Sequence, residues 1–213
     1  MADCHSCVIA FADTTSKSNM TMSEGEEKPL VILTGFDSFA HYDKNPSWEA
    51  VKLVSCTRAR LEKVCVPVEY EAAERLCEQI WSRQPQLVVH CGVSPREHEA
   101  GGLHLECCAI TNKPCYVNPD QKGLIPCACD KGEGEEEKVE CGLDMSAVAE
   151  KVKAAKSAGL ISLSAEVSDD AGRYLCEYIF GCSLKHNRRA IFIHVPEEKY
   201  FGVEEVSRAL EVA

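Results

Sequence analysis

The chain has 213 residues, of which 45% are hydrophobic and 27% are charged, so it is long enough for one compact domain with a substantial core. Its net charge of -11 argues against nucleic acid or an anionic membrane as the main partner, because both favour a basic protein surface. No apolar run approaches the roughly 20 residues that cross a bilayer, and no basic segment precedes the short apolar run near the N terminus. We therefore expect a soluble, cytoplasmic protein.

The N-terminal residues 1–28 are rich in Ser, Thr, Asp, Glu and Lys and show no sustained hydrophobic period. Such a composition is typical of a disordered tail, so we place the folded domain at residues 29–213. Cys4, His5 and Cys7 are residue types that bind metals, but this short run supplies too few ligands for a closed site.

Residues 29–35 form a continuous apolar run, PLVILTG, which is typical of a buried strand. The loop after it carries Phe36 and Phe39 and leads to a predicted helix at residues 47–54. Asn45 and the proline after it resemble the start of this helix.

Residues 61–69 are the next predicted strand, and residues 70–84 have apolar side chains at helical spacing. Residues 86–93, QLVVHCGV, are a second short apolar run and predict a buried parallel strand. Because such runs alternate with helical segments, we expect an α/β fold with helices on both faces of a mostly parallel sheet. We interpret His90, in the middle of the second run, as a hydrogen-bonded core histidine rather than a ligand.

Residues 94–142 have the least regular pattern of the chain. Glu106 lies in an alternating segment, LHLEC, and an acidic, cysteine-rich part follows it. The cysteines suggest a zinc site as one alternative, but no closely spaced pair is repeated as zinc knuckles require. We therefore favour a long, acidic, solvated loop at residues 107–142. The cysteines in question are Cys107, Cys108, Cys115, Cys127, Cys129 and Cys141.

The chain contains 14 cysteines, which is many for a cytosolic protein. Several, such as Cys65, Cys77 and Cys91, fall inside strand-like or helix-like runs, where a free cysteine packs as a small hydrophobic residue. Because we find no export signal, we do not expect a disulfide framework. Most of these cysteines are therefore interpreted as packing residues.

The C-terminal part continues the alternation of helices and strands. Residues 143–159 predict a helix that ends at its glycine, and residues 160–167 predict a strand. Residues 190–196 predict the last buried strand, and residues 203–213 predict a short amphipathic helix.

Cys176 lies just beyond a junction between a strand and a helix, in the segment SDDAGRYLCEY. A thiol in the first turn of a helix is partly exposed, and the helix dipole favours its ionised form. If Asp170 caps the helix, however, Cys176 lies in the second turn and the dipole has little effect. We therefore expect His194, rather than the helix dipole, to activate the thiol.

Three chemically suited side chains end or follow predicted strands, namely Cys176, His194 and Glu106. Ligands of an open parallel sheet bind outside the carboxyl ends of its strands, so we expect these side chains to meet there. Together they are the parts of an activated thiol nucleophile. His194 would take the thiol proton and later protonate a leaving amine, while Glu106 would orient the imidazole.

Six segments of the chain resemble the pyroglutamyl-peptidase I family, cytosolic cysteine peptidases that remove an N-terminal pyroglutamate. They run in the family's order from about residue 30 to 210, and they are VILTGFDSFAHYDKNPSWEAVKLV, VCVPVEY, PQLVVHCGVS, LHLEC, SDDAGRYLCEYIF and AIFIHVP. The resemblance implies a single-domain, three-layer α/β/α sandwich. It also implies hydrolysis through a thioester acyl-enzyme, with pyroglutamyl peptides as substrates and no metal or cofactor.

The resemblance further implies roles for individual residues. These are catalysis for Cys176, His194 and Glu106, and substrate binding for Phe36, Phe39 and Asn45. Pyroglutamate is a small, uncharged lactam, so an apolar slot with a few matching hydrogen bonds suits it. The two phenylalanines are the implied walls of this slot.

The chain also departs from the family pattern. Members commonly carry a basic residue where this chain has Cys107, and many microbial members have a glutamine where it has Val93. The segment at residues 107–142 matches poorly, and the last helix stops early, at Ala213. Two alternatives therefore stay open: a catalytically silent homologue that binds pyroglutamyl peptides or a protein partner, and a thiol-based redox or metal-responsive protein that uses Cys107 to Cys141.

Overall fold

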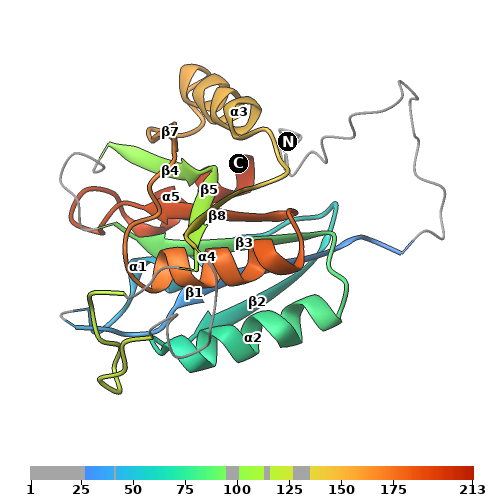
Figure 1. The fold of residues 1–213 in the computed structure, drawn as a ribbon. Helices are drawn as coiled ribbons and strands as arrows, with labels where there is room; N and C mark the ends of the chain where they lie inside the picture. The colour runs from blue at the N-terminus through green and yellow to red at the C-terminus, as the bar shows by residue number, and fades with distance from the viewer. Residues whose placement is uncertain (1–26, 41, 95–100, 113–115, 127–134) are drawn as a thin grey trace.

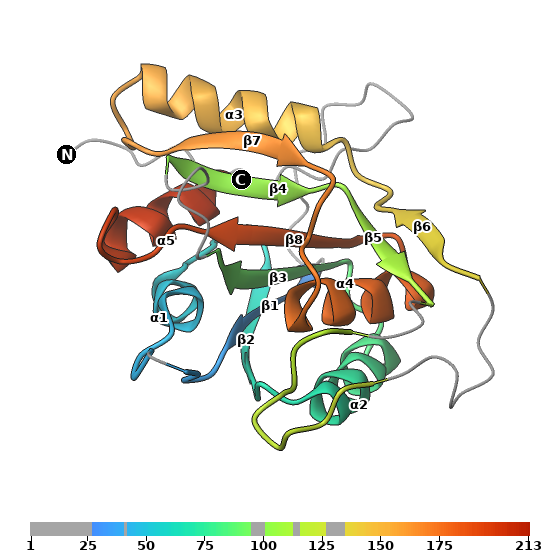
Figure 2. The ribbon, with the colours of Figure 1, turned by 60° about the vertical axis from the view of Figure 1, so that its left-hand side comes forward.

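The computed structural model describes residues 27–40, 42–94, 101–112, 116–126 and 135–213. Within them, six strands form a central sheet in the order β2-β1-β3-β8-β4-β7 (Figures 1 and 2). These strands are β1 (Leu30–Phe36), β2 (Arg60–Val66), β3 (Leu87–Val93), β4 (Gly102–Glu106), β7 (Ser164–Ser168) and β8 (Ala190–Val195).

The direction of the strands changes within this sheet. The strands β2, β1, β3 and β8 run parallel to one another, as their apolar runs predict. In contrast, β4 is antiparallel to β8, and β7 is parallel to β4. The prediction of a mostly parallel sheet is therefore confirmed, but the carboxyl end of β4 does not point to the same edge as that of β8.

Helices cover both faces of the sheet. Three of them share an apolar core with one face: α1 (Pro46–Leu53), α3 (Met145–Ser157) and α5 (Val203–Val212). Two lie side by side on the other face: α2 (Tyr70–Ser82) and α4 (Leu175–His186) (Figure 2). Neighbouring residues of β1 point to opposite faces of the sheet. Val31 belongs to the core with α1, α3 and α5, whereas Ile32 belongs to a cluster with Ile80 of α2. This arrangement confirms the three-layer α/β/α sandwich.

The end of α3 explains why the following strand starts later than predicted. Gly159 has a φ of 71°, and the amide of Leu160 donates to the carbonyl of Ala155 at 3.0 Å. This left-handed helix cap uses residues that the apolar pattern assigns to the strand. As a result, β7 begins at Ser164 rather than at residue 160.

A small second sheet replaces part of the predicted solvated loop at residues 107–142. Its strands, β5 (Cys108–Thr111) and β6 (Glu137–Glu140), are antiparallel. Ala109 and Val139 are buried in the core that contains α4. The loop prediction is therefore wrong for these two segments, because strands of four residues are too short to show a clear hydrophobic period.

The interpretation of His90 as a core residue is confirmed. It is fully buried in β3, where its Nδ1 lies 2.8 Å from Oγ1 of Thr34 and its Nε2 lies 2.7 Å from Oγ of Ser183. Burial lowers the pKa of His90 to about 3, so the ring is neutral near pH 7. Both ring nitrogens therefore have partners inside the protein.

The cysteines of the described segments are all free thiols. Of the cysteines predicted to pack in the core, Cys77 and Cys91 are buried, whereas Cys65 is only partly buried. Cys108, predicted to lie in a solvated loop, is also buried. In the part of the chain that the structure describes, no helix combines the length and apolar character needed to cross a membrane. Only Glu27 and Lys28 of the predicted tail are among the described residues. Cys4, His5 and Cys7 lie outside them.

Candidate active site

Cys176 is the second residue of α4, because Tyr174 is the N-cap of this helix. The sequence suggested Asp170 as the cap. Instead, its Oδ1 accepts the amide of Gly172 at 3.1 Å, and Gly172 has a φ of 91°, which is outside the helical region. Of the two alternatives left open by the sequence, the structure excludes the second turn. Cys176 lies in the first turn, where the positive end of the helix dipole stabilises negative charge on the sulfur.

The sulfur of Cys176 lies against the middle of the sheet. The segment after β7 crosses from the sheet edge to α4, which packs on β8 and β3 (Figure 2). A Cβ atom at Gly92 on β3 would lie 2.8 Å from Sγ of Cys176 and 2.7 Å from Cζ of Phe192. Gly92 therefore leaves the room that the thiol occupies. The motifs do not predict this role, although a glycine inside a strand often marks such a close approach.

His194 and Glu106 form a buried hydrogen bond between neighbouring strands, with Nδ1 of His194 2.7 Å from Oε1 of Glu106. In the antiparallel pairing, His194 lies opposite His104 and Glu106 lies opposite Phe192. The two bonded side chains are therefore diagonal neighbours on one face of the sheet. The sequence predicts that these two side chains meet, but for a different reason. It predicts that the carboxyl ends of parallel strands bring them together, whereas they meet across an antiparallel pair of strands.

The electrostatics of His194 depend on two partners. Burial lowers the pKa of His194, but the charge and hydrogen bond of Cys176, together with those of Glu106, outweigh burial and raise the pKa to about 10. Because Nδ1 is bound to Glu106, Nε2 is the ring nitrogen left for the thiol. Oε2 of Glu106 is buried and has no hydrogen-bond partner among the described residues. The arrangement therefore favours the protonated, positively charged form of His194.

Aromatic side chains belong to the same apolar cluster as Cys176. Phe36 is buried, and Phe39, Tyr174 and Cys176 are partly buried in the same apolar cluster. The rings of Phe39 and Tyr174 lie 5.6 Å apart, and the hydroxyl of Tyr174 donates to the carbonyl of Pro119 at 3.0 Å. The structure thus places Phe36 and Phe39 in one apolar cluster with Cys176 and adds Tyr174, an aromatic residue two positions before the thiol to which the motifs assign no role.

Asn45 is the N-cap of α1 and is buried. Its Oδ1 accepts the amide of Ser47 at 3.1 Å and the hydroxyl of the same residue at 2.9 Å. Its Nδ2 donates to the carbonyl of Asp37 at 3.1 Å, and Oγ of Ser47 accepts the amide of Phe36 at 3.1 Å. Asn45 therefore fixes the loop between Phe36 and Phe39, and its predicted contact with substrate stays a prediction.

A sequence profile of the pyroglutamyl peptidase family matches residues 29–200. The chain belongs to this family. Pyroglutamyl-peptidase 1 of Mus musculus is 34% identical over 197 residues, which are 87% of this chain and 88% of that protein. Pyrrolidone-carboxylate peptidase of Bacillus amyloliquefaciens is 29% identical over 205 residues, which are 86% of this chain and 89% of that protein. The resemblance seen in the motifs is confirmed.

Solved structures of pyroglutamyl peptidases share the fold. Pyroglutamyl peptidase I from Bacillus amyloliquefaciens aligns with a TM-score of 0.71 and 28% identity, covering 87% of this chain and 93% of that chain. Pyrrolidone carboxyl peptidase from Thermus thermophilus also gives 0.71, with 24% identity and coverage of 86% and 97%. The fold predicted from the sequence is therefore that of the family.

Cys107, which replaces the basic residue common in the pyroglutamyl peptidase family, lies away from Cys176. Cys107 packs with Leu105 in the core under α1, α3 and α5, whereas Cys176 belongs to the core on the opposite face. Alternation along the strand directs Glu106 to the face of Cys176 instead. Within the described residues, no three His, Cys, Asp or Glu side chains are grouped closely enough to hold a metal ion. Cys115, Cys127 and Cys129 lie outside those residues.

Proposed function

We propose that this chain is a cytoplasmic cysteine peptidase that hydrolyses the bond after an N-terminal pyroglutamyl residue. The observation that carries the proposal is the buried hydrogen bond between His194 and Glu106, with Cys176 close enough to raise the pKa of His194, in a member of the pyroglutamyl peptidase family. These three residues can supply a nucleophile, a base and an orienting group. The free thiols of the described residues are in keeping with a reducing compartment.

The first half of the reaction forms a thioester. The thiolate of Cys176 attacks the carbonyl carbon of pyroglutamate, and the carbonyl electron pair moves to oxygen. When the tetrahedral intermediate collapses, the bond to the peptide nitrogen breaks, and the imidazolium of His194 gives its proton to the leaving amine. The shortened peptide leaves with a new N-terminal amine.

The second half releases pyroglutamate. Neutral His194 takes a proton from water, the resulting hydroxide attacks the thioester, and the carbon–sulfur bond breaks to restore the thiolate and the imidazolium. Glu106 holds Nδ1 of His194 throughout, which fixes the ring and stabilises its positive charge. Amides in the first turn of α4 have no intrahelical acceptors, so they are suitable donors for the oxyanion.

The aromatic groups beside Cys176 suit the proposed substrate. A pyroglutamyl residue has no ammonium group, so its lactam ring can enter an apolar site without the desolvation cost of a charge. Phe36 and Phe39 supply this surface, and the contact between Phe39 and Tyr174 holds it next to the nucleophile. An ordinary N-terminal residue would have to bring its charge into the same site.

A fluorogenic pyroglutamyl amide tests this proposal with reduced, folded protein. We expect steady release of the fluorophore by the wild-type chain and loss of turnover in Cys176→Ala. Cys182→Ala is the matched control, because Cys182 is another partly exposed thiol on α4 and should be dispensable. Absence of turnover by wild-type protein that still binds a pyroglutamyl peptide would instead indicate the silent homologue, and full activity of Cys176→Ala would refute the assigned nucleophile.

A further inference from the structure

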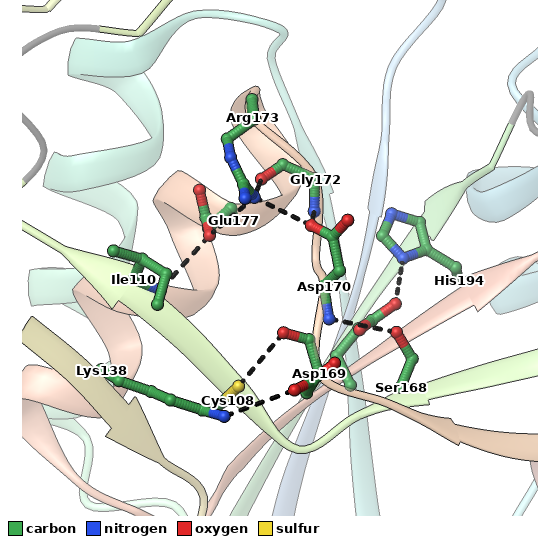
Figure 3. A network of polar contacts seen from close by, with 11 residues as sticks. Cys108, Ile110, Lys138, Ser168, Asp169, Asp170, Gly172, Arg173, Glu177 and His194 are labelled. Carbon is green, nitrogen blue, oxygen red and sulfur yellow. Dashed lines mark hydrogen bonds and ion pairs between the residues drawn. The ribbon is translucent and has the colours of Figure 1, made fainter.

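Glu177, the residue after the nucleophile, is buried although the proposed chemistry does not use it. Only 1% of the residue is exposed. Its Oε1 accepts the amide of Ile110 on β5 at 3.3 Å and forms an ion pair with Arg173 at 3.7 Å (Figure 3). Burial of a carboxylate is costly unless it has such partners, so its place next to Cys176 requires an explanation.

Arg173 connects Glu177 to the loop that leads into α4. Its guanidinium donates to Oδ1 of Asp170 at 2.8 Å and to the carbonyl of Gly172 at 2.6 Å (Figure 3). The amide of Gly172 donates to the same carboxylate oxygen of Asp170. Arg173 therefore joins the turn at Asp170 and Gly172, which precedes Cys176, to Glu177, which follows Cys176 in the first turn of α4.

Ile110 connects Glu177 to the other half of the site. It lies on β5, which follows the strand of Glu106 after a single residue. The amide of that residue, Cys107, donates to the carbonyl of Ser168 at 2.8 Å, and Sγ of Cys108 donates to the carbonyl of Asp169 at 3.4 Å. The start of α4 and the end of β4 are thus tied together, which fixes the spacing between Cys176 and the His194–Glu106 pair.

Glu177 directly follows Cys176 in the chain, so the charges of this network lie close to the thiol. A carboxylate beside a thiolate destabilises it by repulsion, and the Arg173 cation offsets that repulsion. Ionisable groups that interact with Cys176 include His194, which binds Glu106, and the tyrosines Tyr70 and Tyr174. Arg173, which also binds Asp170, supplies a positive charge 3.7 Å from Glu177.

We propose that Arg173 and Glu177 are a positioning pair for Cys176: Glu177 holds the nucleophile helix to β5, and Arg173 neutralises the buried carboxylate so that the thiolate can form. Neither residue touches the reacting atoms. The proposal deepens the peptidase function proposed above and rests on it for its effect on turnover. Its effect on the thiol itself can be measured without turnover.

The test compares Arg173→Gln, Glu177→Gln and the double variant with wild type. The alkylation rate of Cys176 by iodoacetamide is followed against pH, with the Cys176 peptide quantified by mass spectrometry. Arg173→Gln should move the midpoint of alkylation to higher pH by roughly half a unit or more, and Glu177→Gln should move it to lower pH. The double variant should return toward the wild-type midpoint, because both charges are absent.

Glu177→Ala separates the positional effect from the charge effect. Alanine cannot accept the amide of Ile110, so kcat should fall by roughly ten- to a hundredfold while KM changes little. Glutamine retains the acceptor, so Glu177→Gln should keep most of kcat. The control is Lys153→Gln, which removes an exposed ion pair with Glu150 on α3 and should leave alkylation and kcat unchanged.

Thermal unfolding distinguishes a positioning role from a general effect on stability. The proposal is overturned if Arg173→Gln and Glu177→Gln alkylate with the wild-type midpoint, or if lower thermal stability accompanies every loss of kcat without any change in that midpoint. Because alkylation needs no peptide substrate, shifted midpoints in a protein that does not hydrolyse pyroglutamyl amides would retain the positioning pair and refute the peptidase function instead.

Discussion

Gly92 and Cys176 are in such close contact that a single methyl group between them would displace the nucleophile. A Cβ atom at position 92 would lie 2.8 Å from Sγ of Cys176, which is too short for a carbon and a sulfur that are not bonded to each other. We predict that Gly92→Ala folds but loses kcat by on the order of a hundredfold, because a small misplacement of a reacting atom has effects of this size. The measurement is kcat for a pyroglutamyl amide, alongside thermal unfolding.

Gly101→Ala is the control for this prediction. A Cβ atom at Gly101 would have no neighbour within 4 Å, so the same change in backbone freedom occurs without a new contact. It should retain wild-type activity. Wild-type kcat in Gly92→Ala would show that the sulfur has room to move and that the close contact does not matter.

Removal of the carboxylate from Glu106 should change both the rate and the pH profile. Cys176 and Glu106 together raise the pKa of His194 to about 10, which keeps the proton for the leaving amine on the ring. In Glu106→Gln the proton is held less strongly, so the alkaline limb of kcat/KM should move to lower pH. The rate should fall by on the order of ten-thousandfold, since a related amide substitution in a catalytic triad has an effect of this size.

The pH profile of kcat/KM between pH 6 and 11 checks this expectation. Glu166→Gln is a suitable control, because Glu166 is an exposed residue of the neighbouring strand β7. An alkaline limb that stays in place, or moves to higher pH, in Glu106→Gln would contradict the assigned role of the carboxylate.

The elements found correctly from the sequence are those with an unambiguous hydrophobic pattern. β1 and β3 are continuous apolar runs, which are typical of buried parallel strands, and α3 ends just before Gly159 as its pattern predicts. β5 and β6 have four residues each, so the period of two is repeated too few times to be recognised. Their burial depends on α4, which is remote in the sequence.

The sequence predicts the contacts between the site residues less well than it predicts the residues themselves. Residue types and motifs predict Cys176, His194 and Glu106 as the catalytic residues, but alternation is the same in parallel and antiparallel strands, so it does not reveal that β4 runs against β8. The start of α4 depends on the positive φ of Gly172, a backbone feature that the capping residues before it conceal. Both features depend on geometry that no local pattern encodes.

Protonation of His90 should destabilise the fold in acid. Burial lowers its pKa from 6.5 to about 3, so the unfolded chain binds more protons than the folded chain between these values. Stability from neutral His90 is therefore complete above pH 6.5 and is lost as the pH falls toward 3. The slope should be up to roughly 1.4 kcal/mol per pH unit. In His90→Gln, this part of the slope should disappear.

Denaturant unfolding at pH 7, 6, 5 and 4 provides the comparison. His90→Gln should also lose about 1 to 3 kcal/mol at pH 7, because Thr34 and Ser183 lose well-placed partners. His186→Gln replaces an exposed histidine at the end of α4 and should keep the wild-type slope. Equal slopes in wild type and His90→Gln would exclude His90 as the source of acid sensitivity.

Asp120 should stabilise the conformation of the segment at residues 116–126. Its carboxylate accepts the amides of Tyr70, Lys122 and Leu124 at 2.8 to 3.0 Å. Burial raises its pKa, but these hydrogen bonds outweigh burial and lower it, so their stabilisation is present near neutral pH and is lost as the pH falls in the acid range. Asp120→Ala should cost roughly 2 to 4 kcal/mol of unfolding free energy at pH 7.

The same variant should also affect substrate binding. The segment contacts the site through the carbonyl of Pro119, which accepts the Tyr174 hydroxyl, so its loosening should raise KM more than it lowers kcat. Steady-state kinetics and chemical denaturation measure the two effects. Asp43→Ala, at an exposed position, is the control. Unchanged stability in Asp120→Ala would mean that the three amides find other acceptors.

Asn45 allows the capping of α1 to be separated from the shape of the substrate slot. Asn45→Ala loses both functions, because Oδ1 caps Ser47 and Nδ2 holds the carbonyl of Asp37. We expect a loss of about 1 to 2 kcal/mol in stability. KM for the pyroglutamyl amide should rise by roughly tenfold, which corresponds to one hydrogen bond of about 1.4 kcal/mol.

Asn45→Asp distinguishes these functions, since its carboxylate still caps α1 but cannot donate to Asp37. Its stability should stay near wild type while KM rises almost as far as in Asn45→Ala. Lys44→Ala, at the exposed neighbouring position, should change neither quantity. If KM follows stability in both variants, the slot depends on α1 alone; if KM rises only in Asn45→Asp, the new charge, rather than the lost donor, is responsible. Either result would exclude the Asp37 hydrogen bond as the feature that shapes the slot.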